Sequence, residues 1–230
     1  MSSSGTRDIF VQVSNRMPTH NLQGQVVGRK GQLTRLRLIE TLCEMLRHRP
    51  LNDLRIMDLC REAKTSPGTF YLYFKDVQDL AFEAIRLYQE IPAELDELLL
   101  AEWPAEEAFE YAQRFVAGYV RYWQERYHLL HIRNLTADQG DERMVELRHS
   151  CVVPIMERLA GKIAGASGQR SGPLTPLAGA TVIMGSLERL AALSRFHVAP
   201  RTDMSTQDLV DAEAWVLARM LGQDEFPASG

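Results

Sequence analysis

Apolar residues recur along most of the chain with the 3.6-residue period of an amphipathic α-helix. The first such stripe consists of Leu33, Leu36, Ile39, Leu42, Cys43 and Leu46. We expect this helix to end at Arg49–Pro50, because the residue before a proline disfavours the helical conformation. A second, shorter stripe holds Ile56, Leu59, Cys60 and Ala63. No alternation with a period of two appears, so the pattern predicts helices and no strands.

Capping residues mark the starts of two further helices. Ser66 and Pro67 fit the N-cap and the first helical position of a third helix. Asp76 fits the N-cap of a fourth helix, whose apolar stripe runs through Leu80 and Ile85. Three short helices in succession, with a brief connection between the second and third, are typical of a helix-turn-helix.

Longer helices are expected beyond about residue 90. We expect them over residues 104–123, 127–137, 142–164, 174–197 and 206–221. Pro154 is expected to interrupt or bend the third of these helices. Residues 138–141 and 167–173 are rich in turn-forming residues, which predicts a chain break and a surface loop.

These patterns predict an all-α fold of about nine helices. Its parts are a flexible basic N-terminal arm over residues 1–31, a helix-turn-helix domain over 32–80, and a larger helical bundle over 81–230. No internal repeat is visible.

The charge is unevenly distributed between these parts. The net charge is −4, yet residues 1–80 hold 12 basic against 8 acidic residues, and residues 81–230 hold 14 against 22. A basic end on an acidic body suits a protein that presents that end to a polyanion, although chance variation also accounts for such a split.

The third helix carries side chains that suit contact with DNA. Phe70 and Phe74 are four residues apart and are expected in the core, whereas Tyr71 and Lys75 form one exposed flank and Thr69 and Tyr73 another. Gly68 leaves the helix start without a side chain, where free N–H groups and a partial positive charge attract phosphate. A plain core helix would explain the two phenylalanines but not the tyrosines and the lysine.

The segment SPGTFYLYFKDVQDL resembles the signature of the TetR family of transcriptional regulators. In that signature a Ser/Gly/Thr helix start runs into Tyr-x-Tyr-Phe and then into an acidic, leucine-bearing fourth helix. The resemblance covers Thr34 to about Ile85 and implies that the third helix lies in the major groove of double-stranded operator DNA. It further implies a C-terminal domain that dimerises and binds a small-molecule effector.

The resemblance implies DNA-contacting roles for residues around the third helix. Those near base edges or phosphates would be Thr65, Ser66, Pro67, Gly68 and Thr69. Those gripping the backbone would be Arg55, Tyr71, Tyr73 and Lys75.

Two residues depart from the family pattern. Lys64 stands at the turn position where the family usually has glycine, and a left-handed conformation there would cost roughly 1 kcal/mol. Val77 stands where the family usually has a phosphate-contacting lysine, so Lys64 or Lys75 is expected to replace that contact. The segment Gly28–Gly31, followed by Arg35 and Arg37, is either an arm that reaches the minor groove or a solvated basic tail.

The C-terminal half offers weaker signals. Small residues around Ala178–Ala180 and Gly185, with the last helix, suggest a four-helix homodimer interface. An aromatic-rich helix suggests an apolar effector pocket, although ordinary core packing explains the same residues. The candidate effector-binding residues are Phe115, Tyr119, Tyr122, Trp123, Met156 and Met184.

The sequence gives little support to metal, cofactor or enzyme chemistry. His128 and His131 lie near Glu125, but a surface or polar-core role is expected for them, so we predict no metal and no cofactor. No nucleophile elbow, P-loop, HExxH or paired-carboxylate arrangement is present, so we predict that the chain is not an enzyme.

The chain's cysteines and the lack of long apolar segments indicate its surroundings. Cys43, Cys60 and Cys151 form no CxxC pair, which favours reduced thiols in a cytoplasmic protein. No segment is long and apolar enough for a secretory signal or a membrane span, so no membrane partner is expected.

The favoured hypothesis is a repressor released from its operator by a small, largely apolar ligand. The alternatives are a DNA-binding protein without a ligand and a small helical enzyme.

Overall fold

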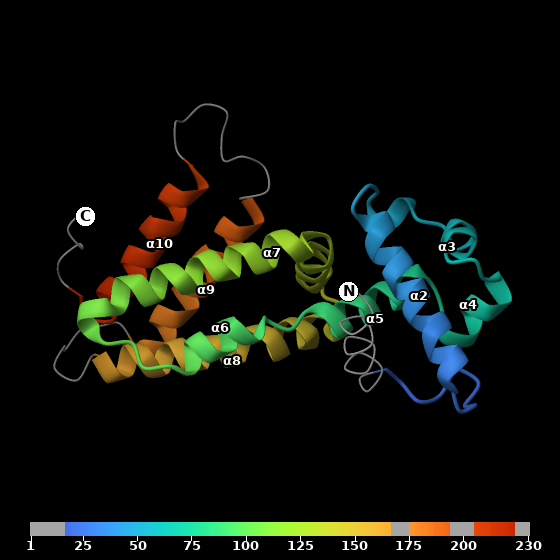
Figure 1. The fold of residues 1–230 in the computed structure, drawn as a ribbon, viewed down its shortest axis with the longest axis horizontal. Helices are drawn as coiled ribbons and strands as arrows, with labels where there is room; N and C mark the ends of the chain where they lie inside the picture. Colours follow the sequence, from blue (N-terminus) through green and yellow to red (C-terminus); the bar gives the residue numbers. More distant parts are fainter. Residues whose placement is uncertain (1–16, 167–174, 194–204, 224–230) are drawn as a thin grey trace, which may run out of the picture. The chain divides into compact units, whose positions relative to one another are not determined.

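The computed structural model describes residues 17–166, 175–193 and 205–223. Residues 1–16 of the expected arm, the expected loop over 167–173 and the end of the helix expected over 174–197 lie outside the described residues. The described helices are α2 (Arg29–Leu46), η1 (Leu51–Asp53), α3 (Ile56–Glu62), α4 (Pro67–Tyr73), α5 (Val77–Tyr88), α6 (Ala93–Leu100), η2 (Ala105–Glu107), α7 (Ala108–Asp138), α8 (Glu142–Ala166), α9 (Pro176–Leu193) and α10 (Thr206–Met220) (Figure 1). These nine α-helices confirm the all-α fold, and the described residues contain no strand beyond one isolated bridge between His20 and Val26.

The chain forms two compact units. The N-terminal unit consists of Met1–Gln89 together with His128–Val145, and the C-terminal unit consists of Glu90–Tyr127 together with Glu146–Gly230. The end of α7 and the beginning of α8 therefore belong to the N-terminal unit.

Helix α2 is the centre of the N-terminal unit and packs on α3, α4 and α5. Leu38, Ile39 and Leu42 are fully buried on it. Leu38 lies on this face although the expected stripe omitted it, and Leu33 is 41% exposed although the stripe included it. Helix α2 also begins at Arg29, four residues earlier than the apolar stripe suggested.

The helices of the C-terminal half differ from the expected ones in three places. Helix α7 is a single helix of 31 residues where two were expected, because Gln124, Glu125 and Arg126 are good helix formers and nothing breaks it there. Helix α6 was not predicted. Helix α8 runs 25 residues through Pro154 without interruption.

Other boundaries agree with their local signals. The break after α7 is confirmed, since Gly140 adopts a φ of 92°, which favours glycine. Helix α10 begins with a capping box, in which Ser205 and Asp208 exchange side-chain and backbone hydrogen bonds. Within the described parts of the chain, no helix is long and apolar enough to cross a membrane.

Candidate DNA-binding surface and effector cleft

Helix α4 has a well-defined start. The Ser66 hydroxyl accepts a hydrogen bond from the backbone N–H of Thr69 at 3.1 Å, and Pro67 occupies the first turn, which confirms the predicted cap. The Ser66 and Thr69 hydroxyls also bond to each other at 2.9 Å. Phe70 and Phe74 are fully buried, with ring centroids 5.6 Å apart, so they anchor the helix to the core as predicted.

The DNA-contacting candidates gather around this helix start and along α4. Arg55 is the N-cap residue of α3, and the other nine occupy the α3–α4 turn, α4 itself and the residue after Phe74. Those exposed to solvent are Arg55, Lys64, Ser66, Gly68, Tyr71 and Lys75. Those half-buried are Thr65, Pro67, Thr69 and Tyr73. The structure thus brings together exposed hydroxyl groups and cations, with Tyr71 52% exposed.

Tyr73 is more enclosed than the sequence suggested. A Cβ atom on Gly31 would lie 2.9 Å from the Tyr73 hydroxyl oxygen and 2.6 Å from Cγ1 of Val27. The tyrosine therefore packs against the first turn of α2, and only glycine fits there without displacing a neighbour. No local pattern in α4 could have revealed this contact, because Gly31 is far away in the sequence.

The two departures from the family pattern have clear structural settings. Lys64 has a φ of 51°, so it adopts the left-handed conformation whose cost was considered for this turn position. Val77, 8% exposed, is the first residue of α5 and is buried in the core. The Asp76 carboxylate accepts from the Asp79 backbone N–H at 2.7 Å, which confirms the predicted cap of this helix.

The basic segment before α2 differs from the expected flexible arm. Residues 17–28 fold as a short hairpin, in which Val27 N–H donates to the Thr19 carbonyl at 2.8 Å. Arg29 and Lys30 are exposed in the first turn of α2, whereas Arg35 is 4% exposed and bonds Glu83 at 3.1 Å. Arg35 is therefore a core residue and no part of a DNA-facing arm. Its position three and four residues before Leu38 and Ile39 was the available signal, since that spacing places it on the buried face.

Asp79, in the first turn of α5, contacts both the end of α4 and the start of α8. This carboxylate accepts the backbone N–H of Lys75, just beyond α4, at 3.0 Å. It also lies 3.7 Å from the Arg143 guanidinium at the start of α8, which stacks 5.0 Å from the Phe82 ring. One side chain thus connects the end of α4 with the first turn of α8.

The candidate effector residues lie mostly in the closed core of the C-terminal unit. Phe115, Tyr119, Trp123 and Met184 are at most 2% exposed. Met156 is half-buried on α8. The buried Trp123 indole N–H has no hydrogen-bond acceptor among the described residues.

Tyr122, the remaining candidate, lines a cleft of about 790 Å³ between α6 and α7. Leu95, Leu98, Ala117 and Gly118 contribute to its lining, and a Cβ on Gly118 would come within 2.5 Å of Leu95. The close approach of α6 to α7 therefore depends on this glycine. The sequence offered no local signal for this cleft, because α6 itself was not predicted.

Arginines border this cleft. Arg114 and Arg121 are exposed and seven residues apart on α7, so they share a helical face with Ala117 and Gly118 between them. Arg126 already pairs with Glu125 at 2.9 Å and lies 5.1 Å over the Tyr122 ring. Arg121 is exposed on this face, and the carboxylates of Glu94 and Glu125 also line the cleft.

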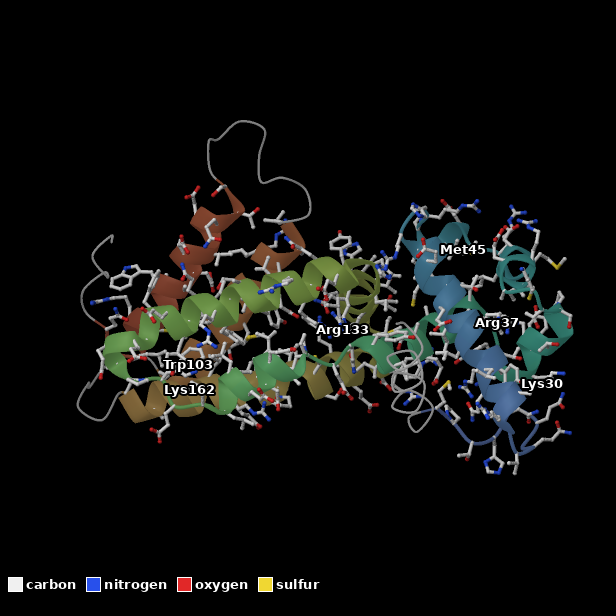
Figure 2. The ribbon with its side chains drawn as sticks, in the orientation of Figure 1. Lys30, Arg37, Met45, Trp103, Arg133 and Lys162 are labelled. Atoms are coloured by element: carbon white, nitrogen blue, oxygen red, sulfur yellow. The ribbon has the colours of Figure 1, made fainter. Side chains whose placement is uncertain are left out.

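A second cleft, of about 960 Å³, lies between the end of α6 and α8, and its cations are already engaged. Figure 2 shows Trp103 and Lys162 together, with the ammonium 4.8 Å from the ring centroid. Lys162 donates to the Ala101 carbonyl, and burial lowers the pKa of its ammonium. Arg158 donates to Asp96. This second cleft is therefore the weaker candidate for an anionic ligand.

Helix α9 packs on α10 and exposes several aliphatic and small residues. Leu177 and Val182 are 54% and 62% exposed, and nothing lies within 4 Å of a Cβ placed on Gly185. Val216 on α10 is 46% exposed. Large exposed aliphatic side chains beside small residues are typical of a helix-packing surface.

Among the residues that the structure describes, no group of three or more His, Cys, Asp or Glu side chains is arranged to hold a metal ion.

Comparisons with known proteins agree with this architecture. The family model described as "Tetracyclin repressor-like, C-terminal domain" matches residues 95–214. No curated protein sequence matches the chain.

Several solved structures share the fold. The fatty acid degradation regulator FadR from Bacillus halodurans is 13% identical with a TM-score of 0.60, over 83% of this chain and 97% of its own. A TetR/AcrR-family regulator from Thermobifida fusca YX-ER1 is 16% identical with a TM-score of 0.58, over 80% and 96%. FadR from Bacillus subtilis, in complex with stearoyl-CoA, is 15% identical with a TM-score of 0.56, over 83% and 99%.

Proposed function

The chain belongs to the TetR family of transcriptional regulators, and we propose that it is a repressor that a small, largely apolar effector releases from operator DNA. Its DNA-binding domain comprises residues 32–80, and the C-terminal domain binds the effector and holds two copies together.

The observation that carries the DNA-binding proposal is the exposed side of α4. Its core side is fixed by Phe70 and Phe74, while Tyr71 and Lys75 remain in solvent. The helix start has Gly68 without a side chain and a capped, positively polarised end. Such a helix fits the major groove, with its start near base edges and its flanks near phosphates.

A homodimer places two such helices on one operator. We assign the interface to the faces of α9 and α10 on which Leu177, Val182 and Val216 are exposed. Pairing these faces about a two-fold axis would form a four-helix contact. The two recognition helices are then expected about one DNA turn apart, roughly 34 Å.

We assign the effector to the cleft between α6 and α7. Its floor of Leu95, Leu98 and Tyr122 suits an apolar body, and Arg114 and Arg121 suit an anionic end. The stearoyl-CoA bound by FadR of Bacillus subtilis combines an apolar chain with a charged head and supports this ligand class.

Release requires that the effector prefer a conformation that binds DNA poorly. We propose that it shifts α5, which follows the recognition helix directly in the chain. Asp79 is the contact through which α5 holds both the end of α4 and Arg143.

Binding of the full-length protein to fragmented genomic DNA, with sequencing of the retained fragments, tests the DNA-binding proposal. Enrichment of a palindromic site supports it, and uniform recovery of all fragments refutes it.

Titration of fatty acids and acyl-CoA thioesters into the operator complex, followed by fluorescence anisotropy, tests release. Arg121→Ala is expected to raise the effector concentration needed for half-release, whereas Arg219→Ala, the same charge change outside the cleft, is not. If ligands that raise the melting temperature leave operator affinity unchanged, the release proposal fails and a DNA-binding protein without an inducer is favoured.

A further inference from the structure

The hairpin formed by residues 17–28 is built onto the recognition helix itself. The Leu22 backbone N–H donates to the Leu72 carbonyl at 2.9 Å. Leu72 is the second-last residue of α4, so its carbonyl is one of those that a helix end leaves without an intrahelical partner. The hairpin therefore satisfies the C-terminal end of α4 and is fixed beside it (Figure 1).

Further bonds make this hairpin a defined element. Asn21 N–H donates to the Gln25 carbonyl at 2.9 Å, and the Asn21 carboxamide oxygen accepts the N–H groups of Gln23 and Gln25. Gly24 adopts the φ of 78° that the turn requires. The Gln32 side chain donates to the Pro18 carbonyl at 3.0 Å, which ties the hairpin to α2 as well.

The outer surface of the hairpin is exposed and lies next in the chain to two exposed cations. Residues 9–39 contain no aspartate or glutamate. Arg29 and Lys30 are exposed directly after the hairpin, and Figure 2 shows Lys30 at this end of α2. At the turn, Leu22 is 49% and Val26 77% exposed, together with the amides of Gln23 and Gln25.

From this placement we propose that the hairpin is a second DNA-contacting element, which lies against the minor groove next to the major-groove site of α4. Amide side chains and exposed aliphatic groups are the residue types that proteins place in the minor groove. Arg29 and Lys30 then lie against the flanking phosphates. The absence of acidic side chains over residues 9–39 makes this surface complementary to a polyanion.

This inference rests on the proposed DNA-binding function. It assigns a role to residues 17–28, which the sequence predicts as part of a flexible arm. It also explains how the protein compensates for Val77, because two cations at the start of α2 stand beside the same recognition helix.

The charge test compares two double variants of the full-length protein on an operator obtained by selection. Arg29→Ala/Lys30→Ala removes two charges beside the hairpin, and Arg47→Ala/Arg49→Ala removes two at the other end of α2. These ends are separated by roughly 27 Å at 1.5 Å per residue. Loss of two phosphate contacts is expected to lower the slope of log affinity against log salt by about two, and the control pair to leave it unchanged.

The contact test changes the hairpin surface itself. Val26→Asp places a carboxylate on a side chain that is 77% exposed, so folding is retained, and it is expected to weaken operator binding on the order of tenfold. Leu135→Asp, at an aliphatic residue 50% exposed on α7, is the matched control and is expected to bind as the wild type does. Hydroxyl-radical footprints are expected to lose protection at the sugars flanking the α4 site in Val26→Asp alone.

The outcomes separate this inference from the proposed function. If the wild type binds no DNA, the proposed function itself fails. If the wild type binds and the hairpin variants keep its affinity, salt slope and footprint, the hairpin inference alone is overturned. It is also overturned if Val26→Lys weakens binding as much as Val26→Asp, because a surface facing phosphates should tolerate a cation.

Discussion

The pair formed by Arg35 and Glu83 allows a sharp prediction, because replacing one member should destabilise the fold far more than replacing the other. Arg35 on α2 is 4% exposed and bonds the Glu83 carboxylate on α5 at 3.1 Å. Its guanidinium lies 5.2 Å over the Phe74 ring, and its Nε has no acceptor among the described residues. Glu83, 13% exposed, also pairs with Arg86 at 2.9 Å.

Burial dominates the electrostatics of this arginine. It lowers the pKa of the Arg35 guanidinium from its ordinary value despite the attraction of Glu83, which acts in the opposite direction. The free energy lost when the Arg35 guanidinium leaves water is therefore larger than the free energy gained from its attraction to Glu83. Glu83→Gln keeps that charge and removes its counter-ion, which is expected to cost about 3 kcal/mol. Arg35→Met removes the charge and retains an apolar side chain against Phe74, so its expected cost is below about 1 kcal/mol.

Thermal unfolding followed by circular dichroism measures both variants. At roughly 2–4 °C per kcal/mol for a chain of this length, Glu83→Gln should lower the melting temperature by about 6–12 °C. Arg35→Met should remain within about 4 °C of the wild type. In the Arg35→Met background, Glu83→Gln should cost little, because Glu83 then serves only the more exposed Arg86. Equal destabilisation by the two single variants would refute the reasoning that desolvation exceeds attraction.

Three further predictions concern the DNA surface and the response to pH. Lys64→Gly should raise the free energy of unfolding by roughly 1 kcal/mol, because glycine adopts the φ of 51° without the strain that a side chain brings. A lower free energy of unfolding in chemical denaturation would contradict this prediction. Lys64→Ala, which keeps the strain, is the control. Lys75→Ala should reduce the slope of log operator affinity against log salt by about one, and Tyr71→Phe should weaken binding without altering sequence preference. If Lys75→Ala changed the sequence preference and left the slope intact, Lys75 would not contact a phosphate. Burial raises the pKa of Cys43 and of Tyr88 to about 12, so in alkali the unfolded chain loses these protons first, and the free energy of unfolding should fall as pH rises from 9 towards 12. A denaturation midpoint that stays constant over that range would contradict these shifts. Cys43→Ala should make the pH dependence weaker.

Local chemistry was sufficient to predict much of the helix-turn-helix. The caps at Ser66 and Asp76, the left-handed Lys64 and the buried Phe70 and Phe74 all follow from interactions within a few residues. Such interactions are encoded by short spacing, so a single sequence reveals them.

Features that depend on distant partners were missed or misplaced. The hairpin of residues 17–28 looked flexible because its bond to Leu72 and its tie to Gln32 are invisible in its own composition. Arg35 looked like part of a basic arm because its partner Glu83 is 48 residues away. The cleft residues other than Tyr122 were missed for the same reason, since α6 gains its place from packing on Gly118 rather than from a strong pattern of its own.

The composition of the N-terminal unit has a consequence for the order in which the protein becomes complete during synthesis. Its segments Met1–Gln89 and His128–Val145 are separated by 38 residues that belong to the other unit. The ribosome therefore releases the four helices α2 to α5 well before it delivers Arg143, whose guanidinium pairs with Asp79 and lies over the Phe82 ring. At about 5–20 residues per second, that interval lasts several seconds, during which the nascent DNA-binding part lacks one of its own stabilising contacts. A fragment cut after α5 would lack this contact permanently.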